Sequence, residues 1–119
     1  LEKGVAIDQM TFSSDGNAGL TKFDANGNSI GVTKAPIDQN LAQTVALIQK
    51  GGVAITDAFK LITLNPANNL GLQCKGRIEV GSDADLCCFT NDLKLTDVFA
   101  KGQQMMVNGD IIVEGNYEN

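Results

Sequence analysis

Two stretches near the middle of the chain decide its fold: LNPA at residues 64–67 and KGRIEVGSDADL at residues 75–86. In the first stretch, Asn65 is predicted to cap a short helical turn that Pro66 opens and Gly71 ends. From residue 73 onward, short β-type runs alternate with turn signals about every 8 to 12 residues, which is typical of a small sandwich or barrel. We therefore expect an α/β part in residues 1–72 and an all-β part in residues 73–119.

The α/β part combines a strand, a hairpin and helices. The run Met10–Ser14 is short and bounded by polar residues, which predicts a buried strand ending in a loop at residues 15–19. Asn26-Gly27 predicts a type I′ turn between strands at residues 21–23 and 29–32. Pro36 and Thr56 each mark the start of a helix. The apolar face of the first helix is predicted to carry Ile37, Leu41, Val45 and Ile48.

The all-β part is predicted to contain five strands, at residues 77–80, 85–89, 97–100, 104–107 and 111–113. Cys87 and Cys88 are adjacent in one of these strands, so their side chains point to opposite faces of the sheet. A strand conformation therefore keeps them from acting as a thiol pair. We expect buried or half-buried free thiols.

Composition excludes several classes of function. The 119 residues include 9 Lys+Arg, 14 Asp+Glu, 3 Cys and no histidine, for a net charge of −5. The acidic balance argues against nucleic-acid or membrane partners. Without histidine, this chain alone forms no Ser-His-Asp triad and no histidine-ligated zinc site. Three cysteines make no secreted disulfide framework, and we expect a cytoplasmic protein.

Local motifs leave the chemistry open. Asp15 follows the predicted strand, where a carboxylate can ligate a metal, move a proton, or simply bond to its own backbone. A calcium loop starting at Asp24 is excluded, because Ser29 and Ala35 stand where that loop requires Gly and Glu. The glycines at residues 16–19 lack the spacing of a dinucleotide-binding loop.

The LNPA and KGRIEVGSDADL stretches, with Val107-Asn108-Gly109 and the later Gly115, resemble the C-terminal signature of the amidohydrolase superfamily. TFSSDGN at residues 11–17 resembles the last barrel strand of the isoaspartyl dipeptidases (β-aspartyl peptidases), and the likeness covers essentially the whole chain. The resemblance implies the end of a metal-dependent (β/α)8 TIM barrel in residues 1–72, comprising its last strand, loop and helices. Part of a small β-sandwich then occupies residues 73–119.

The resemblance also implies a site. Asp15 matches the aspartate that ligates the metal centre and shuttles a proton between the nucleophilic water and the leaving amine. Gly16, Asn17 and Gly19 match the substrate loop. Many members of the family carry a serine where this chain has Gly19, so backbone groups of residues 16–19 are expected to replace that contact. Two zinc ions are implied, and all their other ligands lie outside this chain.

The expected function is hydrolysis of β-aspartyl dipeptides by a longer, homo-oligomeric enzyme. The chain begins with leucine, and LEKG at residues 1–4 is typical of a helix end, although a tag-cleaved start would also lack methionine. We expect the chain by itself to be inactive and, with unpaired strand edges, not to be a clean monomer. The alternatives are a dihydroorotase-like enzyme, an amino-sugar deacetylase, or a non-catalytic binding or scaffold module.

Overall fold

The computed structural model describes residues 3–16, 18–34 and 36–116. The helix end predicted at residues 1–4 lies partly outside this range, and Asn17 lies wholly outside it. The chain divides into two compact units, Leu1–Asn65 and Pro66–Asn119. The predicted division at residue 72, between barrel and sandwich, stays a prediction.

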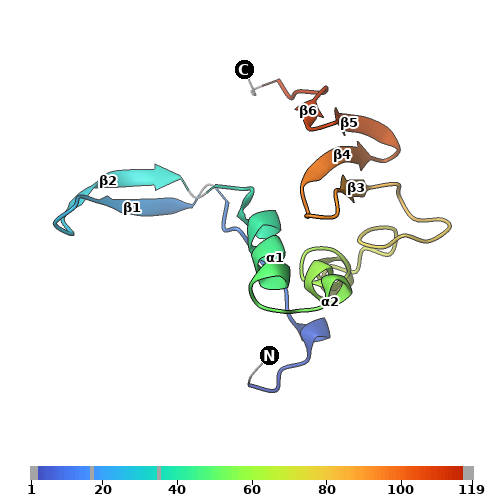
Figure 1. The fold of residues 1–119 in the computed structure, drawn as a ribbon, viewed down its shortest axis with the longest axis horizontal. Coiled ribbons are helices and arrows are strands. Elements are labelled where there is room, and N and C mark those ends of the chain that lie inside the picture. Colours follow the sequence, from blue (N-terminus) through green and yellow to red (C-terminus); the bar gives the residue numbers. More distant parts are fainter. Residues whose placement is uncertain (1–2, 17, 35, 117–119) are drawn as a thin grey trace. The chain divides into compact units, whose positions relative to one another are not determined.

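The first unit holds a short 3-10 helix, a β-hairpin and two α-helices (Figure 1). In chain order these are η1 (Ile7–Gln9), β1 (Gly19–Phe23), β2 (Ser29–Lys34), α1 (Gln39–Gln49) and α2 (Ile55–Lys60). A third helix, α3 (Leu64–Asn69), crosses the boundary between the units. The hairpin and the helices that follow it confirm the order predicted for residues 19–69.

The hairpin turn differs from the predicted one. Of its two signal residues, Gly27 has a positive φ of 82°, whereas Asn26 is not in the left-handed region, so the turn is not type I′. Instead, Asp24 Oδ1 accepts hydrogen bonds from the backbone N–H groups of Asn28 and Asn26, both at 2.9 Å. The Asn28 N–H is the largest of the effects that hold the pKa of Asp24 below its ordinary value. A side chain therefore organises this loop.

The core of the first unit lies where α1 and α2 meet. Ala58, Leu61 and Thr44 are fully buried there, and the Thr44 hydroxyl donates to the Asn40 carbonyl at 2.8 Å. Ile37 was predicted on the apolar face of the first helix, but it precedes α1 and is 71% exposed. The predicted cap at Thr56 is also wrong, because α2 begins at Ile55. Both corrections shift a helix start by one to three residues, the range within which sequence signals are least precise.

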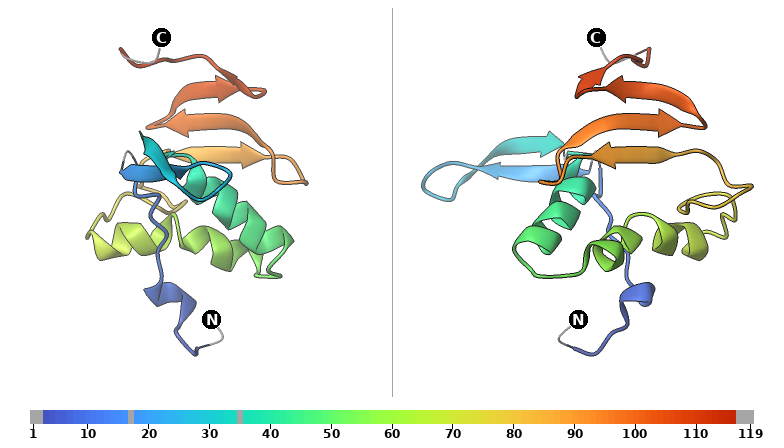
Figure 2. Two further views of the ribbon diagram at one scale, coloured as in Figure 1. Left: turned by 90° about the vertical axis from the view of Figure 1, so that its left-hand side faces the viewer. Right: turned by 45° about the vertical axis from the view of Figure 1, so that its right-hand side comes forward.

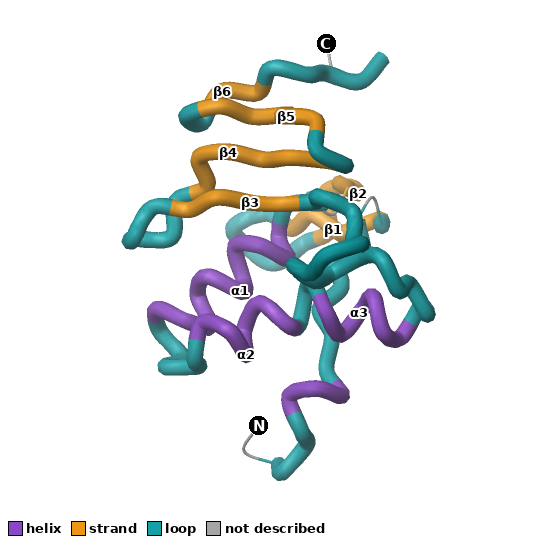
Figure 3. Tube along the Cα trace, turned by 90° about the vertical axis from the view of Figure 1, so that its right-hand side faces the viewer, coloured by secondary structure: helices purple, strands orange, loops and turns teal. Residues whose placement is uncertain are grey.

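The second unit contains one antiparallel sheet of four strands in the order β3-β4-β5-β6 (Figures 2 and 3). The strands are β3 (Leu86–Phe89), β4 (Leu95–Ala100), β5 (Gln103–Val107) and β6 (Asp110–Ile111). The strand predicted at residues 77–80 is wrong: this stretch forms turns and bends, and its apolar side chains Ile78 and Val80 are exposed. The remaining four predicted strands are confirmed.

One face of this sheet carries a row of apolar side chains across all four strands. Cys87 lies opposite Val98, Val98 opposite Met106, and Met106 opposite Ile111. The prediction of buried or half-buried thiols is wrong, since Cys74, Cys87 and Cys88 are all exposed. The physical reason is that the described part of this unit is a single sheet, with no second layer to cover the faces that carry Cys87 and Cys88.

The loop that leads into the sheet is held by a cluster of charges around Lys75. Its Nζ lies 2.8 Å from Asp83 Oδ2 and 2.5 Å from Asp85 Oδ2. The other oxygen of Asp85 accepts the backbone N–H of Lys101 at 2.8 Å, which ties the loop to the end of β4. KGRIEVGSDADL thus brings its lysine and two aspartates together although they are up to ten residues apart.

This cluster predicts a pH-dependent stability. Asp83 and Asp85 raise the pKa of Lys75, while Lys75 and the Lys101 N–H lower the pKa of Asp85. A lowered carboxyl pKa stabilises the fold above the ordinary value of 3.8, and this is lost as the pH falls through the folded-state pKa. A raised lysine pKa stabilises the fold below 10.5, and this is lost as the pH rises through the folded-state pKa.

Urea unfolding of the protein as a function of pH measures the effect. Lys75→Met should lower stability by a constant amount between about pH 5 and pH 9, and the difference should shrink below about pH 4. Lys22→Met, at an exposed lysine of β1, is the matched control and should show no such pH profile. Identical pH profiles for the two variants would contradict a stabilising role for the cluster.

Candidate active site

The segment that leads to Asp15 is extended but is not a β-strand. Met10 has extended backbone angles, φ −108° and ψ 145°, yet residues 10–15 pair with no strand among the described residues. The predicted strand at residues 10–14 is therefore absent from this structure. A strand requires a neighbouring strand for its backbone bonds. Here the Phe12 N–H instead donates to the carbonyl of Leu61 at 3.1 Å.

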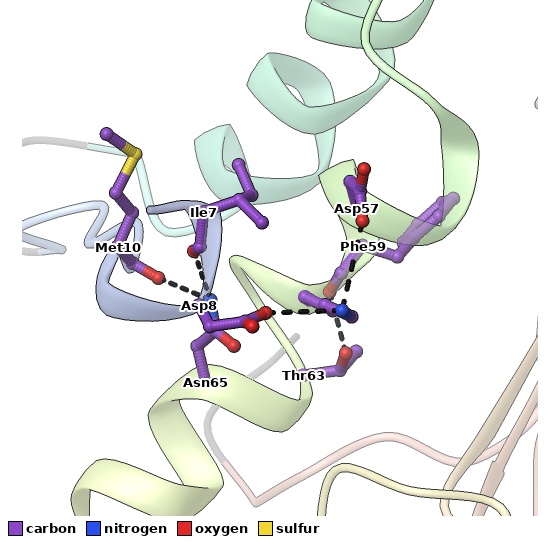
Figure 4. Close-up of polar contacts among 8 residues, drawn as sticks. Ile7, Asp8, Met10, Asp57, Phe59, Thr63 and Asn65 are labelled. Atoms are coloured by element: carbon purple, nitrogen blue, oxygen red, sulfur yellow. Dashed lines mark hydrogen bonds and ion pairs between the residues drawn. The ribbon is translucent and has the colours of Figure 1, made fainter. Parts of the chain in front are cut away.

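Asn65 supplies further bonds to this segment. Its side-chain nitrogen donates to the carbonyls of Ile7 at 2.8 Å and Met10 at 2.7 Å (Figure 4). Asn65 was predicted to cap α3, but it lies inside the helix and is buried, with 3% of its surface exposed. Leaving one buried acceptor without its donor costs about 1–3 kcal/mol. No local sequence pattern indicates this role, because the bond partners of Asn65 lie 55 and 58 residues away in the chain.

Weaker contacts surround the same region (Figure 4). Lys60 Nζ lies 3.2 Å from Asp8 Oδ1 and 3.8 Å from Asp57 Oδ1, which joins η1 to α2. The Thr63 hydroxyl donates to the carbonyl of Phe59 at 2.6 Å, just beyond the end of α2. Exposed ion pairs of this kind typically contribute about 0–1 kcal/mol. The buried amide of Asn65 is therefore the stronger constraint on the segment.

Asp15 lies in a tight turn at the end of the segment. Its φ of 49° is left-handed, a conformation that aspartate tolerates better than most residues. Its backbone N–H donates to Ser13 Oγ at 3.3 Å, and its carbonyl accepts the N–H of Ala18 at 3.0 Å. Asp15 itself is exposed. The turn thus holds the backbone and presents the carboxylate to the surroundings.

Of the predicted substrate loop, Gly16 lies in this turn and Gly19 follows it. A Cβ placed on Gly16 would lie 2.6 Å from Ile37 Cγ2, so a residue with a side chain would clash there. Gly19 opens β1 opposite Lys34. A Cβ on Gly19 would lie 3.3 Å from Val32 Cγ1, which is tight. The structure brings Asp15, Gly16 and Gly19 into one turn and the strand that follows it, and their roles toward a substrate stay predictions.

The side chains that could ligate a metal ion decide whether this chain can bind one by itself. Within residues 3–16, 18–34 and 36–116, no three His, Cys, Asp or Glu side chains are grouped closely enough to bind a metal ion. The sequence has no histidine, which is a common zinc ligand. Asp15 can therefore supply one ligand at most, and the described residues do not form a zinc site on their own.

Comparisons with known proteins show the family of this chain. The amidohydrolase family matches residues 1–112, and the chain belongs to this family. Over 98% of its length it is similar to the crystal structure of a β-aspartyl dipeptidase from Fervidobacterium islandicum AW-1 in complex with β-Asp-Leu dipeptide, with a TM-score of 0.78 and 32% identity. The similarity to this class of enzyme confirms the resemblance seen in the sequence.

Other relatives match shorter stretches. An adenine deaminase from Bdellovibrio bacteriovorus is 38% identical over 68 residues, 57% of this chain, and a dihydroorotase from Clostridium botulinum is 43% identical over 49 residues, 41% of this chain. An N-acetylglucosamine-6-phosphate deacetylase from Pasteurella multocida covers 82% of the chain with a TM-score of 0.57, but at 24% identity it supports the fold alone.

The chain spans a small part of every one of these proteins: 31% of the dipeptidase, 26% of the deacetylase, 12% of the dihydroorotase and 11% of the adenine deaminase. Its small sheets and few helices are those of part of an amidohydrolase-like fold. Among the described residues, no helix has the length and apolar character needed to cross a membrane.

Proposed function

We propose that this chain is part of a longer metal-dependent amidohydrolase that cleaves β-aspartyl dipeptides. The observation that carries the proposal is the similarity to a β-aspartyl dipeptidase over 98% of the chain at 32% identity. The adenine deaminase and the dihydroorotase match 57% and 41% of the chain. On this proposal, residues 1–72 end a (β/α)8 barrel and residues 73–119 contribute to a small β-sandwich.

Asp15 carries the chemistry proposed for this chain. In the reaction, the oxygen of a water molecule bonds to the amide carbon of the dipeptide, and the carbon–nitrogen bond breaks. Asp15 accepts the proton that the water loses and delivers it to the leaving amine. Asp15 is exposed, which suits this role because water and a substrate can reach its carboxylate.

The remaining parts of the proposal concern what binds around Asp15. Backbone groups of Gly16 and Gly19 contact the dipeptide, in place of the serine that many relatives carry. Two zinc ions are proposed for the longer protein, with Asp15 as the one ligand from this chain. We also propose that the longer protein is a cytoplasmic homo-oligomer.

A substrate panel with the full-length protein tests the proposal. We expect kcat/KM for β-Asp-Leu to exceed the values for α-Asp-Leu, dihydroorotate, adenine and N-acetylglucosamine 6-phosphate by at least roughly 100-fold. The α-linked isomer is the matched control, because it has the same atoms with the peptide bond on the other carboxyl. A preference for dihydroorotate would favour the second candidate, a dihydroorotase-like enzyme, which the 43% identity over 49 residues supports.

A further inference from the structure

Asn65 differs from the other polar residues of the first unit in being buried with its amide directed at backbone far away in the chain. One side-chain NH₂ group has two hydrogens, and here it donates to two carbonyls, those of Ile7 at 2.8 Å and Met10 at 2.7 Å. Ile7 is the first residue of η1 and Met10 directly follows the helix, so the amide holds the position at which the extended segment begins (Figure 4).

The segment from Met10 to Asp15 takes its place from these bonds rather than from a neighbouring strand. Two residues after Met10, the Phe12 N–H bonds to the Leu61 carbonyl at 3.1 Å, so Leu61 and Asn65 hold the segment at two points, Met10 and Phe12. Asp15 follows three residues later, and its turn packs against Ile37 through the close approach at Gly16. A displacement of the backbone at Met10 is therefore transmitted along a short, extended stretch to the Asp15 carboxylate.

We propose that Asn65 is a positioning residue: through the carbonyls of Ile7 and Met10, its buried amide places the segment that presents Asp15 to the substrate. This inference rests on the proposed function, because Asp15 is the acting group in it. Displacing a reacting group by about 1 Å is enough to lower a rate 100-fold. We therefore expect the amide of Asn65 to act on turnover more than on substrate affinity.

The test compares Asn65→Ala and Asn65→Asp with Asn69→Ala and Asn69→Asp in the full-length protein. Asn69 is in the same helix and exposed, so the same changes there are matched controls. Asn65→Ala removes both donors, whereas Asn65→Asp keeps the shape and turns an acceptor toward the two carbonyls. All assays with β-Asp-Leu are made well below the melting temperature of each variant.

We expect both Asn65 variants to lower kcat by about 10- to 100-fold while KM changes less than about threefold. Amide hydrogen exchange should rise in residues 7–15 and stay unchanged in the sheet at residues 86–111. The Asn69 variants should match the unsubstituted protein in all three measurements. If Asn65→Asp does not fold, Asn65→Ala, which brings no charge into the helix, still decides the outcome.

Three results would overturn the proposal. A wild-type kcat in Asn65→Ala, together with loss of turnover in Asp15→Asn, would refute the positioning role and leave the proposed function intact. A rise in KM, together with faster amide hydrogen exchange throughout the protein, would show that Asn65 stabilises the fold in general and does not position Asp15. Full turnover in Asp15→Asn would remove both the positioning role and the function proposed for Asp15. The Asp15→Asn result thus separates a failure of this inference from a failure of the proposed function.

Discussion

Asp15→Asn in the full-length protein is expected to lower kcat for β-Asp-Leu hydrolysis by roughly 10²- to 10⁴-fold, the usual contribution of a positioned general base. Asparagine has the same shape but accepts no proton from water at neutral pH. The fold should survive, because asparagine tolerates the left-handed φ of 49° at this position as well as aspartate does. The melting temperature should therefore stay close to that of the unsubstituted protein.

The matched control for this variant is Asp38→Asn. Asp38 precedes α1 at its N-cap position, is exposed and makes no side-chain cap hydrogen bond. The same loss of one negative charge there should leave kcat within about twofold, since Asp38 takes no part in the proposed proton transfer and a single exposed charge has little effect. If Asp15→Asn retained kcat within about threefold of the unsubstituted protein, the role proposed for this carboxylate would be wrong.

The second large effect concerns the 119 residues by themselves. We expect the isolated chain to hydrolyse β-Asp-Leu no faster than buffer, with or without added Zn²⁺. The sequence has no histidine, and the described residues bring together no group of three metal ligands. One carboxylate does not hold a zinc ion against water, because protein zinc sites use three or four ligands.

The measurement needs a control for contaminating peptidases. The isolated chain and its Asp15→Asn variant are prepared in parallel, and equal, slow turnover in both identifies a contaminant. The full-length protein under the same conditions provides the positive control. Turnover by the isolated chain within roughly 100-fold of the full-length protein, and lost in Asp15→Asn, would show that these residues form a working site alone.

Much of the second unit was predictable because its signals are local. Alternating apolar residues and the turn residues between them predict four of its strands, and the structure confirms them at residues 86–89, 95–100, 103–107 and 110–111. The strand predicted at residues 77–80 failed for a physical reason. Its apolar pattern suits a strand, but no strand among the described residues lies beside it to accept its backbone hydrogen bonds, and Ile78 and Val80 stay exposed.

The candidate site divides in the same way. Asp15 could be singled out in the sequence, because TFSSDGN at residues 11–17 resembles a local motif of the isoaspartyl dipeptidases. Sequence reasoning placed Asn65 as a helix cap, because an Asn before a Pro is a strong cap signal. Its true partners, the carbonyls of Ile7 and Met10, are set by how the chain folds back on itself.

By itself, the sequence determined the family, the hairpin and helices of the first unit and four strands of the second, and it singled out Asp15 as the candidate carboxylate. These features depend on which residue types stand close together in the sequence, and that pattern is present before the chain folds. The tertiary structure alone decided that residues 10–15 are held by Leu61 and Asn65 rather than by a strand, and that the cysteines are exposed. Hydrogen bonding and burial depend on groups distant in sequence, so no local pattern specifies them.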